Sequence, residues 1–294
     1  MTDSTRRDVL RGLSLLVAPA VIPAFAQDNP ADPTWERIKK TKAIKVGIFN
    51  QAPYGYMALD GTTTGESVET VRASLRPYGI VNIDAMVTDF GALVPGLVAG
   101  RFDAICAGLY INPTRCQQVA FGNPEIQMGE AFLVKKGNPK KLHSYTDVKD
   151  LPDAKIGVNG GTAEFQLAHQ VGIPEDRILV FSDNSALVAG LRAGRVDCVG
   201  LTVGSAISTL AKAGDSDMDR ALPFTAPLGK DGKEIKGYGA VAFRKQDIAL
   251  RTFYNAGLAK IRESGELLTI LQRFGLSASE LPPADRTPDQ LCVA

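Results

Sequence analysis

Short apolar runs alternate along the chain with longer stretches whose apolar positions have the spacing of an amphipathic helix. The runs predict buried strands at residues 43–49, 83–87, 102–109, 131–135, 155–158, 177–181, 196–201 and 239–243. The longer stretches predict helices at residues 65–78, 91–99, 163–170, 185–193, 203–213, 246–263 and 266–274. Strands that alternate with helices indicate mostly parallel sheets with helices on both faces. We therefore predict an α/β fold.

One stretch of the chain recurs. Residues 93–105 read LVPGLVAGRFDAI and residues 187–199 read LVAGLRAGRVDCV, with identical residues at eight of thirteen positions and a constant offset of 94. Each copy begins with the apolar end of a predicted helix, followed by a glycine suited to a left-handed helix cap. Both copies then have an Arg and an Asp at the same positions, and each ends in an apolar run suited to a buried strand. A weaker echo relates residues 45–48 to residues 155–158. The repeat predicts two similar lobes.

The basic segment 135–141 carries Gly137 and Pro139, which suits a crossing between two lobes. We therefore predict lobe 1 at residues 27–134 plus 238–294 and lobe 2 at residues 135–237. Ligands of such sheets bind beyond the carboxyl ends of the strands. These ends are predicted at residues 50–54, 90, 110–115, 160–162 and 201–205, so two lobes would form a cleft between them.

The first 26 residues have the features of an export leader. Arg6 and Arg7 precede an apolar run at residues 12–22, and Ala24-Phe25-Ala26 has the small-x-small pattern of a cleavage site. We predict a signal peptide of the twin-arginine type, cleaved after Ala26, and a periplasmic mature protein. The alternative is a membrane anchor, but the apolar run is too short to span a bilayer as a helix.

The mature chain has no excess of either charge. Removing the leader, with its three arginines and two aspartates, leaves 30 basic and 30 acidic residues. A neutral chain offers no electrostatic footprint for nucleic acid or for an anionic membrane. We expect a monomer with a small-molecule ligand and no nucleic-acid partner.

The four cysteines fit no zinc-binding spacing. Cys106 and Cys198 fall in predicted buried strands, where a thiol behaves as a small apolar residue. Cys116 follows a strand and Cys292 lies in the C-terminal tail, so an exported chain would favour a Cys116–Cys292 disulfide. We expect no metal and no cofactor.

Candidate ligand-binding side chains lie at the predicted strand ends. Arg115 can hold a carboxylate through two parallel N–H bonds, or it can form a structural ion pair. Thr162 follows two glycines at a helix start, where free amides attract an anion, although it can equally serve only as the helix cap. The rings of Tyr54, Phe90 and Tyr110 can pack a ring or hold a cation, and Phe90 alone can also be a core residue.

The motifs GLVAGRFDA, GLYINPTR, KIGVNGGT and RKQDIALRTFYN resemble those of the family-3 solute-binding proteins of bacterial ABC importers, over nearly all of the mature chain. The segments QAPYGYM, EAFLVKKGNP and GIPEDRI make it most similar to the ectoine and hydroxyectoine binders within that family. The resemblance implies the two-lobed fold of the type II periplasmic binding proteins and delivery of a ligand to a membrane permease. It also implies an aromatic box of Tyr54, Phe90 and Tyr110, with Arg115 and Thr162 holding the ligand carboxylate.

Two positions depart from the family pattern. Gln51 stands where ectoine binders have a Glu for the ring cation, and Thr202 stands where amino-acid binders have an Asp for the ammonium. A neutral side chain cannot neutralise a buried cation, which costs several kcal/mol to leave unpaired. Glu66 is a further acid that could reach the site. The ligand is therefore expected to be an ectoine-like or amino-acid-like zwitterion, or another small carboxylate with a ring or a methylated cation.

Two other function classes compete with a transport-binding module. Some periplasmic dehydratases resemble this family, and an enzyme of that kind would need a general acid or base in the cleft. Glu66, Asp89 and Glu164 are the candidates, but we favour a protein that is not an enzyme. A sensory module would require a fused membrane segment.

Overall fold

The computed structural model describes residues 32–214, 217–228, 234 and 236–293, and the compact unit that contains them is Ala31–Ala294. The leader predicted at residues 1–26 lies outside the described residues. Among the described helices, none is both long enough and apolar enough to cross a membrane.

The first sheet has five strands. Their order is β4 (Asn82–Val87), β1 (Ala43–Ile48), β5 (Ala104–Ile105), β14 (Ala242–Phe243) and β6 (Ala120–Phe121). The pairs β4–β1 and β1–β5 are parallel, whereas β14 is antiparallel to both of its neighbours. The apolar side chains of β1, Ile44, Val46 and Ile48, lie on one face of the strand in one core cluster, whereas Gly47 on the other face packs against the ring of Phe102.

The second sheet repeats this order. Its strands are β10 (Ile178–Phe181), β9 (Ile156–Asn159), β11 (Cys198–Thr202), β8 (Glu130–Lys135) and β12 (Met218–Arg220). Again the first three strands are parallel, and β8 is antiparallel to its neighbours. In each sheet the antiparallel strand occupies the fourth position, and it is the first strand that the chain forms there after leaving the other sheet. The sheets are therefore mixed rather than purely parallel, and the predicted two-lobed α/β fold is confirmed.

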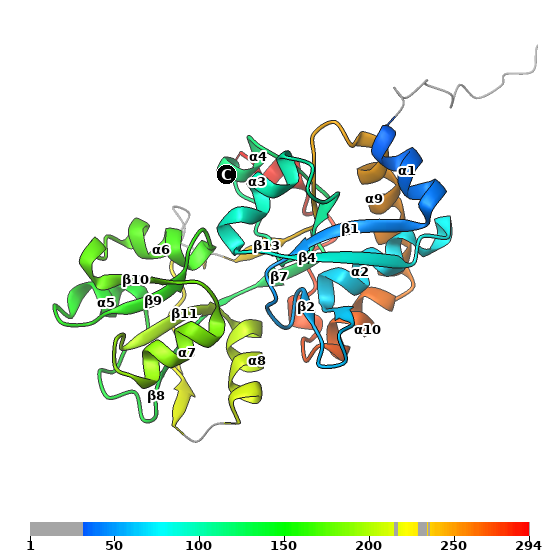
Figure 1. The fold of residues 1–294 in the computed structure, drawn as a ribbon. Coiled ribbons are helices and arrows are strands. Elements are labelled where there is room, and N and C mark those ends of the chain that lie inside the picture. Colours follow the sequence, from blue (N-terminus) through cyan, green and yellow to red (C-terminus); the bar gives the residue numbers. More distant parts are fainter. Residues whose placement is uncertain (1–31, 215–216, 229–233, 235, 294) are drawn as a thin grey trace, which may run out of the picture. The chain divides into compact units, whose positions relative to one another are not determined.

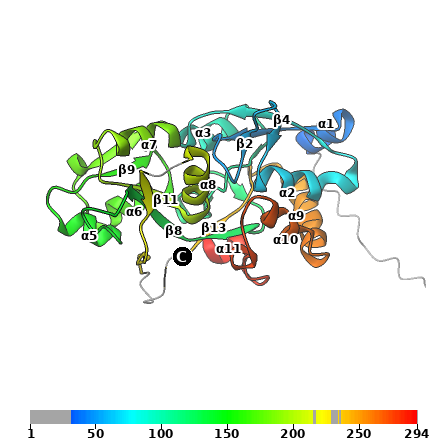
Figure 2. The ribbon, with the colours of Figure 1, turned by 90° about the horizontal axis from the view of Figure 1, so that it is seen from below.

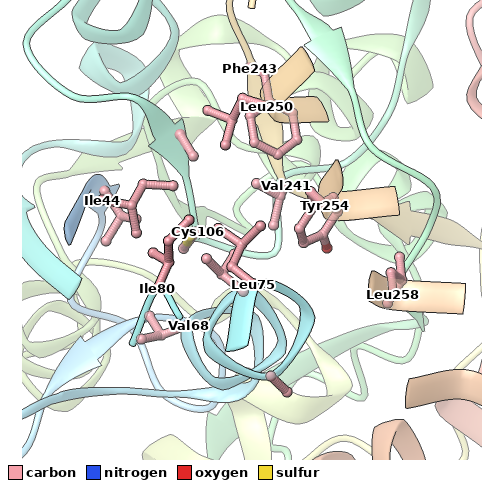
Figure 3. Packing of buried hydrophobic residues seen from close by; sticks show 14 of the residues in the cluster. Ile44, Val68, Leu75, Ile80, Cys106, Val241, Phe243, Leu250, Tyr254 and Leu258 are labelled. Atoms are coloured by element: carbon pink, nitrogen blue, oxygen red, sulfur yellow. The ribbon is translucent and has the colours of Figure 1, made fainter. Parts of the chain in front are cut away.

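Helices cover both faces of each sheet (Figures 1 and 2). The α-helices are α1 (Pro33–Thr41), α2 (Glu66–Leu75), α3 (Leu93–Val98), α4 (Pro113–Cys116), α5 (Tyr145–Asp150), α6 (Ala163–Val171), α7 (Asn184–Arg192), α8 (Val203–Ala213), α9 (Ile248–Glu263), α10 (Glu266–Arg273) and α11 (Pro288–Leu291). In the second sheet α5 and α6 pack on one face and α7 and α8 on the other. In the first, α1, α2 and α9 pack opposite α3. Figure 3 shows the larger core of this sheet, which includes Val68 and Leu75 of α2 and Leu250 and Tyr254 of α9.

Two short antiparallel pairs complete the described strands. They are β7 (Ile126–Met128) with β13 (Gly237–Gly239), and β2 (Tyr56–Met57) with β3 (Thr63–Thr64). The pair β7–β13 holds together the two segments that run between the sheets.

The division of the chain into lobes remains a proposal, and the sheet pairing revises one of its limits. We predicted residues 27–134 plus 238–294 for lobe 1, with the first crossing at residues 135–141. Strand β8 already pairs with β11 over residues 130–134, and Lys135 pairs with Met218 of β12, so these residues belong with the second sheet. We therefore take lobe 2 to begin at residue 130. The basic segment marks a turn within lobe 2, because Gly137 and Lys141 adopt left-handed conformations there.

The sequence repeat corresponds to a repeated hydrogen-bond pattern. Asp103 accepts from the Lys45 backbone amide at 3.0 Å, and Asp197 accepts from the Lys155 amide at 2.8 Å. In return the amide of each aspartate donates to the same lysine's carbonyl oxygen at 2.8 Å. Each aspartate thus ties the start of one parallel strand to the start of its neighbour, which explains why Asp recurs in both copies.

The predicted disulfide is confirmed. The Cys116 and Cys292 Sγ atoms are 2.00 Å apart, and the bridge fastens the C-terminal segment to α4. Cys106 and Cys198 are free thiols that are fully buried, as expected for residues of the two cores.

Candidate functional site

The structure brings all seven predicted site residues together around one cavity. Five come from lobe 1 and two from lobe 2; they are Gln51, Tyr54, Phe90, Tyr110, Arg115, Thr162 and Thr202. The cavity volume is about 20 Å³, which is the scale of a single water molecule. The side chains of the two lobes therefore contact each other closely here, and a larger molecule would have to separate them.

Arg115 lies at the centre of this arrangement. Asn112 caps α4 by accepting from the Arg115 amide at 2.9 Å, and Pro113 occupies the first turn, so the short helix aims the Arg115 side chain from a rigid start. The guanidinium donates to the carbonyl oxygens of Tyr110 and Gly161, both at 2.8 Å. Its Cζ lies 5.4 Å from the centre of the Phe90 ring. The Arg115 side chain thus joins the lobes through neutral acceptors.

Burial changes the titration of Arg115. The residue is only 6% exposed, and this desolvation lowers the pKa of its guanidinium to about 10, while the charge of Glu164 opposes the shift. Arg115 is therefore charged at neutral pH. A buried cation whose N–H groups reach only carbonyl oxygens is a favourable site for a carboxylate, because a charge-assisted hydrogen bond is stronger than a neutral one.

Two further hydrogen bonds join the lobes at the cavity. The hydroxyls of Tyr54 and Thr202 are 2.7 Å apart, and Gln51 Nε2 donates to Ser205 Oγ at 2.7 Å. Burial raises the pKa of the Tyr54 phenol above its ordinary value, so it is neutral over the physiological range. The Tyr54 ring packs against Gly108, where an added Cβ would lie 2.7 Å from the ring and where φ is +58°. Only glycine suits that position.

The two threonines each cap a helix. Thr162 Oγ1 accepts from the Phe165 amide at 3.3 Å and donates to the Asn159 carbonyl oxygen at 2.8 Å. Thr202 Oγ1 accepts from the Ser205 amide at 3.2 Å. Of the two roles considered for Thr162, capping is therefore confirmed, and contact with a carboxylate stays a prediction.

Phe90 both lines the cavity and packs against the core, the two positions that the sequence left open. It lines the cavity at the start of the 3₁₀ turn Phe90–Ala92, and its ring also packs edge-on against Phe49 with centroids 5.5 Å apart. Tyr110 differs, because its hydroxyl donates to Glu130 Oε1 at 3.1 Å. The aromatic side chains of the site are thus fixed by contacts of their own.

Glu164 and Glu130 were not among the predicted ligand-binding residues. Glu164 lines the cavity together with Thr162, and Glu130 accepts the hydrogen bond from the Tyr110 hydroxyl. The sequence analysis considered Glu164 only as a candidate enzymatic acid or base. An acidic residue in the first turn of a helix ordinarily interacts with the helix dipole, so its position alone does not indicate a ligand contact. Glu130 precedes an apolar strand, and nothing in the sequence indicates that this strand pairs with the one that ends at Thr202.

Two other acids lie outside the cavity lining. Glu66 is fully buried in lobe 1 near Glu125, whose carboxylate accepts from Ser67 at 2.6 Å and from Tyr254 at 2.7 Å. Burial and the charge of Glu125 raise the pKa of Glu66 well above its ordinary value. Asp89 does not line the cavity; it lines two other, more open grooves on the surface. The expectation that Glu66 reaches the site is therefore not supported by its position.

Comparison with known proteins identifies the family. The model of the bacterial extracellular solute-binding proteins, family 3, matches residues 44–277. The chain belongs to this family. The resemblance inferred from the sequence motifs is therefore confirmed.

Individual relatives agree with this assignment. A probable amino-acid ABC transporter periplasmic-binding protein, y4tE of Sinorhizobium fredii, is 34% identical over 262 residues, which is 88% of this chain and 86% of the relative. A probable histidine-binding protein of Neisseria gonorrhoeae is 28% identical over 227 residues, or 76% of this chain and 79% of the relative. These relatives are named as binding proteins.

Solved structures confirm the fold. The structure of EhuB in complex with hydroxyectoine is similar with a TM-score of 0.82 and 36% identity, covering 90% of this chain and 99% of EhuB. An ancestral amino acid-binding protein, AncCDT-1, described as a precursor of cyclohexadienyl dehydratase, shares the fold at a TM-score of 0.70 and 24% identity, covering 82% and 99% of the two chains.

Proposed function

We propose that this protein is the periplasmic solute-binding component of an ABC importer, and that it captures a small zwitterion of the ectoine, hydroxyectoine or amino-acid type between its lobes. The observation that carries the proposal is the buried, charged Arg115, whose guanidinium reaches across the cavity to Gly161 of the other lobe. The named relatives and the similarity to EhuB support the same class of ligand.

The contacts across the cavity suggest how a ligand would be held. A ligand carboxylate would take the guanidinium N–H groups that now reach the Tyr110 and Gly161 carbonyl oxygens, at a gain in hydrogen-bond strength. The ligand's apolar ring would lie among Tyr54, Phe90 and Tyr110. Because a ligand must replace direct contacts between the lobes, its binding would be coupled to their separation and closure.

We further propose that the ligand is bound and released unchanged. None of the residues that line the cavity is a histidine, and Glu164 is the one carboxylate among them. An enzyme on this fold would show product after incubation with a prephenate-like substrate, whereas a binding protein would return each ligand intact.

A thermal-shift screen tests the proposal. The panel comprises ectoine, hydroxyectoine, glycine betaine, L-arginine and L-histidine. A ligand at 100 times its dissociation constant should stabilise the protein by about 2.7 kcal/mol, which corresponds to a rise of several degrees in Tm. A panel in which no member raises Tm would contradict the proposal.

Export is a separate part of the proposal. We propose that residues 1–26 form a twin-arginine leader cleaved after Ala26, supported by the Arg6-Arg7 pair and the Ala24-Phe25-Ala26 pattern. The double substitution Arg6→Lys, Arg7→Lys should retain the full-length precursor in the cytoplasm, as measured by fractionation and N-terminal sequencing. Export of the double variant at the parent's level would contradict this route.

A further inference from the structure

Two buried carboxyl groups lie together on one face of the second sheet. Glu130 of β8 is opposite Thr202 of β11 in the antiparallel register, and the same face carries Gly200 two residues earlier. Because Gly200 has no side chain, other groups fill its place: a Cβ there would lie 3.4 Å from Glu164 Cβ and 3.2 Å from the Tyr145 hydroxyl. The helices α5 and α6 thus bring Tyr145 and Glu164 onto the sheet beside Glu130.

Hydrogen bonds hold Glu130 in place. The Tyr110 hydroxyl donates to Glu130 Oε1 at 3.1 Å, and the Tyr145 hydroxyl donates to Oε2 at 3.3 Å. Glu130 is 5% exposed and Glu164 is 6% exposed, so neither carboxyl group has much contact with solvent. Of the two, only Glu164 lines the cavity.

The two carboxyl groups interact electrostatically. Burial raises the pKa of Glu130 well above its ordinary value, and the charge of Glu164 raises it further. Burial also raises the pKa of Glu164, against the opposing effects of its own amide, the Thr162 hydroxyl and the Arg115 charge. The other titratable groups that face the pair are Tyr54, Tyr110 and Tyr145. A negative charge on one carboxyl group therefore disfavours ionisation of the other in this poorly solvated site.

We propose that Glu130 and Glu164 share one proton and together present a single negative charge to the cavity, which pairs with the cationic end of a zwitterionic ligand. The inference rests on the proposed function and names the charge that its ligand requires. Gln51 and Thr202 are neutral, and Glu164 is the one carboxylate that lines the cavity. A ligand that binds with its carboxylate on Arg115 would have its cation within the field of this pair.

Calorimetric titration of variants with hydroxyectoine tests the inference. Glu164→Gln should weaken binding about 10-fold or more, because the remaining carboxylate of Glu130 does not line the cavity. Glu130→Gln should change the dissociation constant by less than about threefold, because Glu164 then carries the single charge. The double variant should lose at least about 30-fold relative to the parent, as expected when a buried cation has no partner. Its loss should exceed the product of the two single losses, because the two carboxyl groups share one charge.

Two controls separate a charge effect from misfolding. Glu125→Gln removes a buried carboxyl outside the cavity lining and should leave the dissociation constant unchanged. Pyroglutamate, a small ring carboxylate without a cation, should bind the double variant at least as tightly as it binds the parent. This ligand also detects a misfolded site, since any loss of shape would weaken both ligands.

Two results would overturn the inference. One is a double variant that binds hydroxyectoine as tightly as the parent does. The other is an equal loss of hydroxyectoine and pyroglutamate binding. A parent protein that binds no zwitterion of the screening panel would instead overturn the proposed function, and this inference with it. If another member of the panel binds more tightly than hydroxyectoine, the same titrations use that zwitterion.

Discussion

Gln51 is the residue at which the chemistry of the site can be changed most simply. Its amide donates to Ser205 Oγ across the cavity. A glutamate at this position could accept from the same hydroxyl, so the contact between the lobes would be preserved while a negative charge is added.

We expect Gln51→Glu to strengthen binding of hydroxyectoine by about 3- to 10-fold, because an extra carboxylate attracts the ligand's cation. The same change should weaken binding of the cation-free pyroglutamate. Titration calorimetry with both ligands gives the comparison. If both ligands gain or both lose affinity, the cation does not lie near residue 51.

The sequence was sufficient to identify the side chains of the cavity that lie at strand ends. Tyr54, Tyr110 and Arg115 each follow a strand of a parallel unit, and such ends converge at one edge of a sheet. Glu130 could not be found in this way, because it begins an antiparallel strand. Its place beside the cavity depends on the β8–β11 register, which no local pattern encodes.

Among the elements, the repeated strand starts are the clearest link between sequence and structure. Asp103 and Asp197 make the same pair of backbone hydrogen bonds, but their ionic surroundings differ. Asp103 is buried and also contacts the guanidinium groups of Arg37 at 2.6 Å and Arg244 at 3.5 Å. Asp197 is partly exposed and contacts Lys140 at 3.1 Å.

Replacing either aspartate should therefore destabilise the fold, to different extents. We expect Asp103→Ala to cost about 3–5 kcal/mol, because it removes a buried carboxylate that contacts two guanidinium groups and a backbone amide. Asp197→Ala should cost about 1–2 kcal/mol, since it removes a hydrogen bond to a backbone amide and a partly exposed ion pair. Urea unfolding of both variants measures the difference. Equal losses would mean that the ion pairs of Asp103 contribute little.

The pattern of apolar residues predicted most helices and the six parallel strands, because an amphipathic helix shows a period and a buried strand lies within a continuous apolar run. The run at residues 102–109 was predicted as one strand, yet only Ala104–Ile105 pair as β5. Beyond it the chain turns through Gly108 to present Tyr110. Strand β7 was missed because three residues have no detectable period, and its pairing with β13 joins segments over a hundred residues apart.

At the scale of the whole molecule, the site requires movement of the lobes. Hydrogen bonds of Gln51, Tyr54, Tyr110 and Arg115 join the lobes at the cavity, and the remaining space is that of about one water molecule. A ligand can enter only when these contacts are broken, and it can then restore the connection between the lobes through its own groups.

We expect the free protein to open in solution by breaking these contacts, and ligand binding to shift it to a closed arrangement, since the groups that hold the ligand come from both lobes. Small-angle X-ray scattering should show a smaller radius of gyration at saturation than in the free protein. A radius that does not change, measured with a ligand whose binding is confirmed by calorimetry, would contradict closure.

The central claim is that Arg115 holds the carboxylate of a solute between the lobes, and titration of hydroxyectoine into the parent and Arg115→Ala tests it most directly. Loss of a buried charge partner costs about 2–5 kcal/mol, so Arg115→Ala should weaken binding about 30-fold or more. Thr162→Ala should lose less, because the backbone amides at the start of α6 remain. Thermal unfolding of the variants checks that they are folded. Binding by Arg115→Ala as tight as that of the parent would show that the carboxylate does not bind at this site.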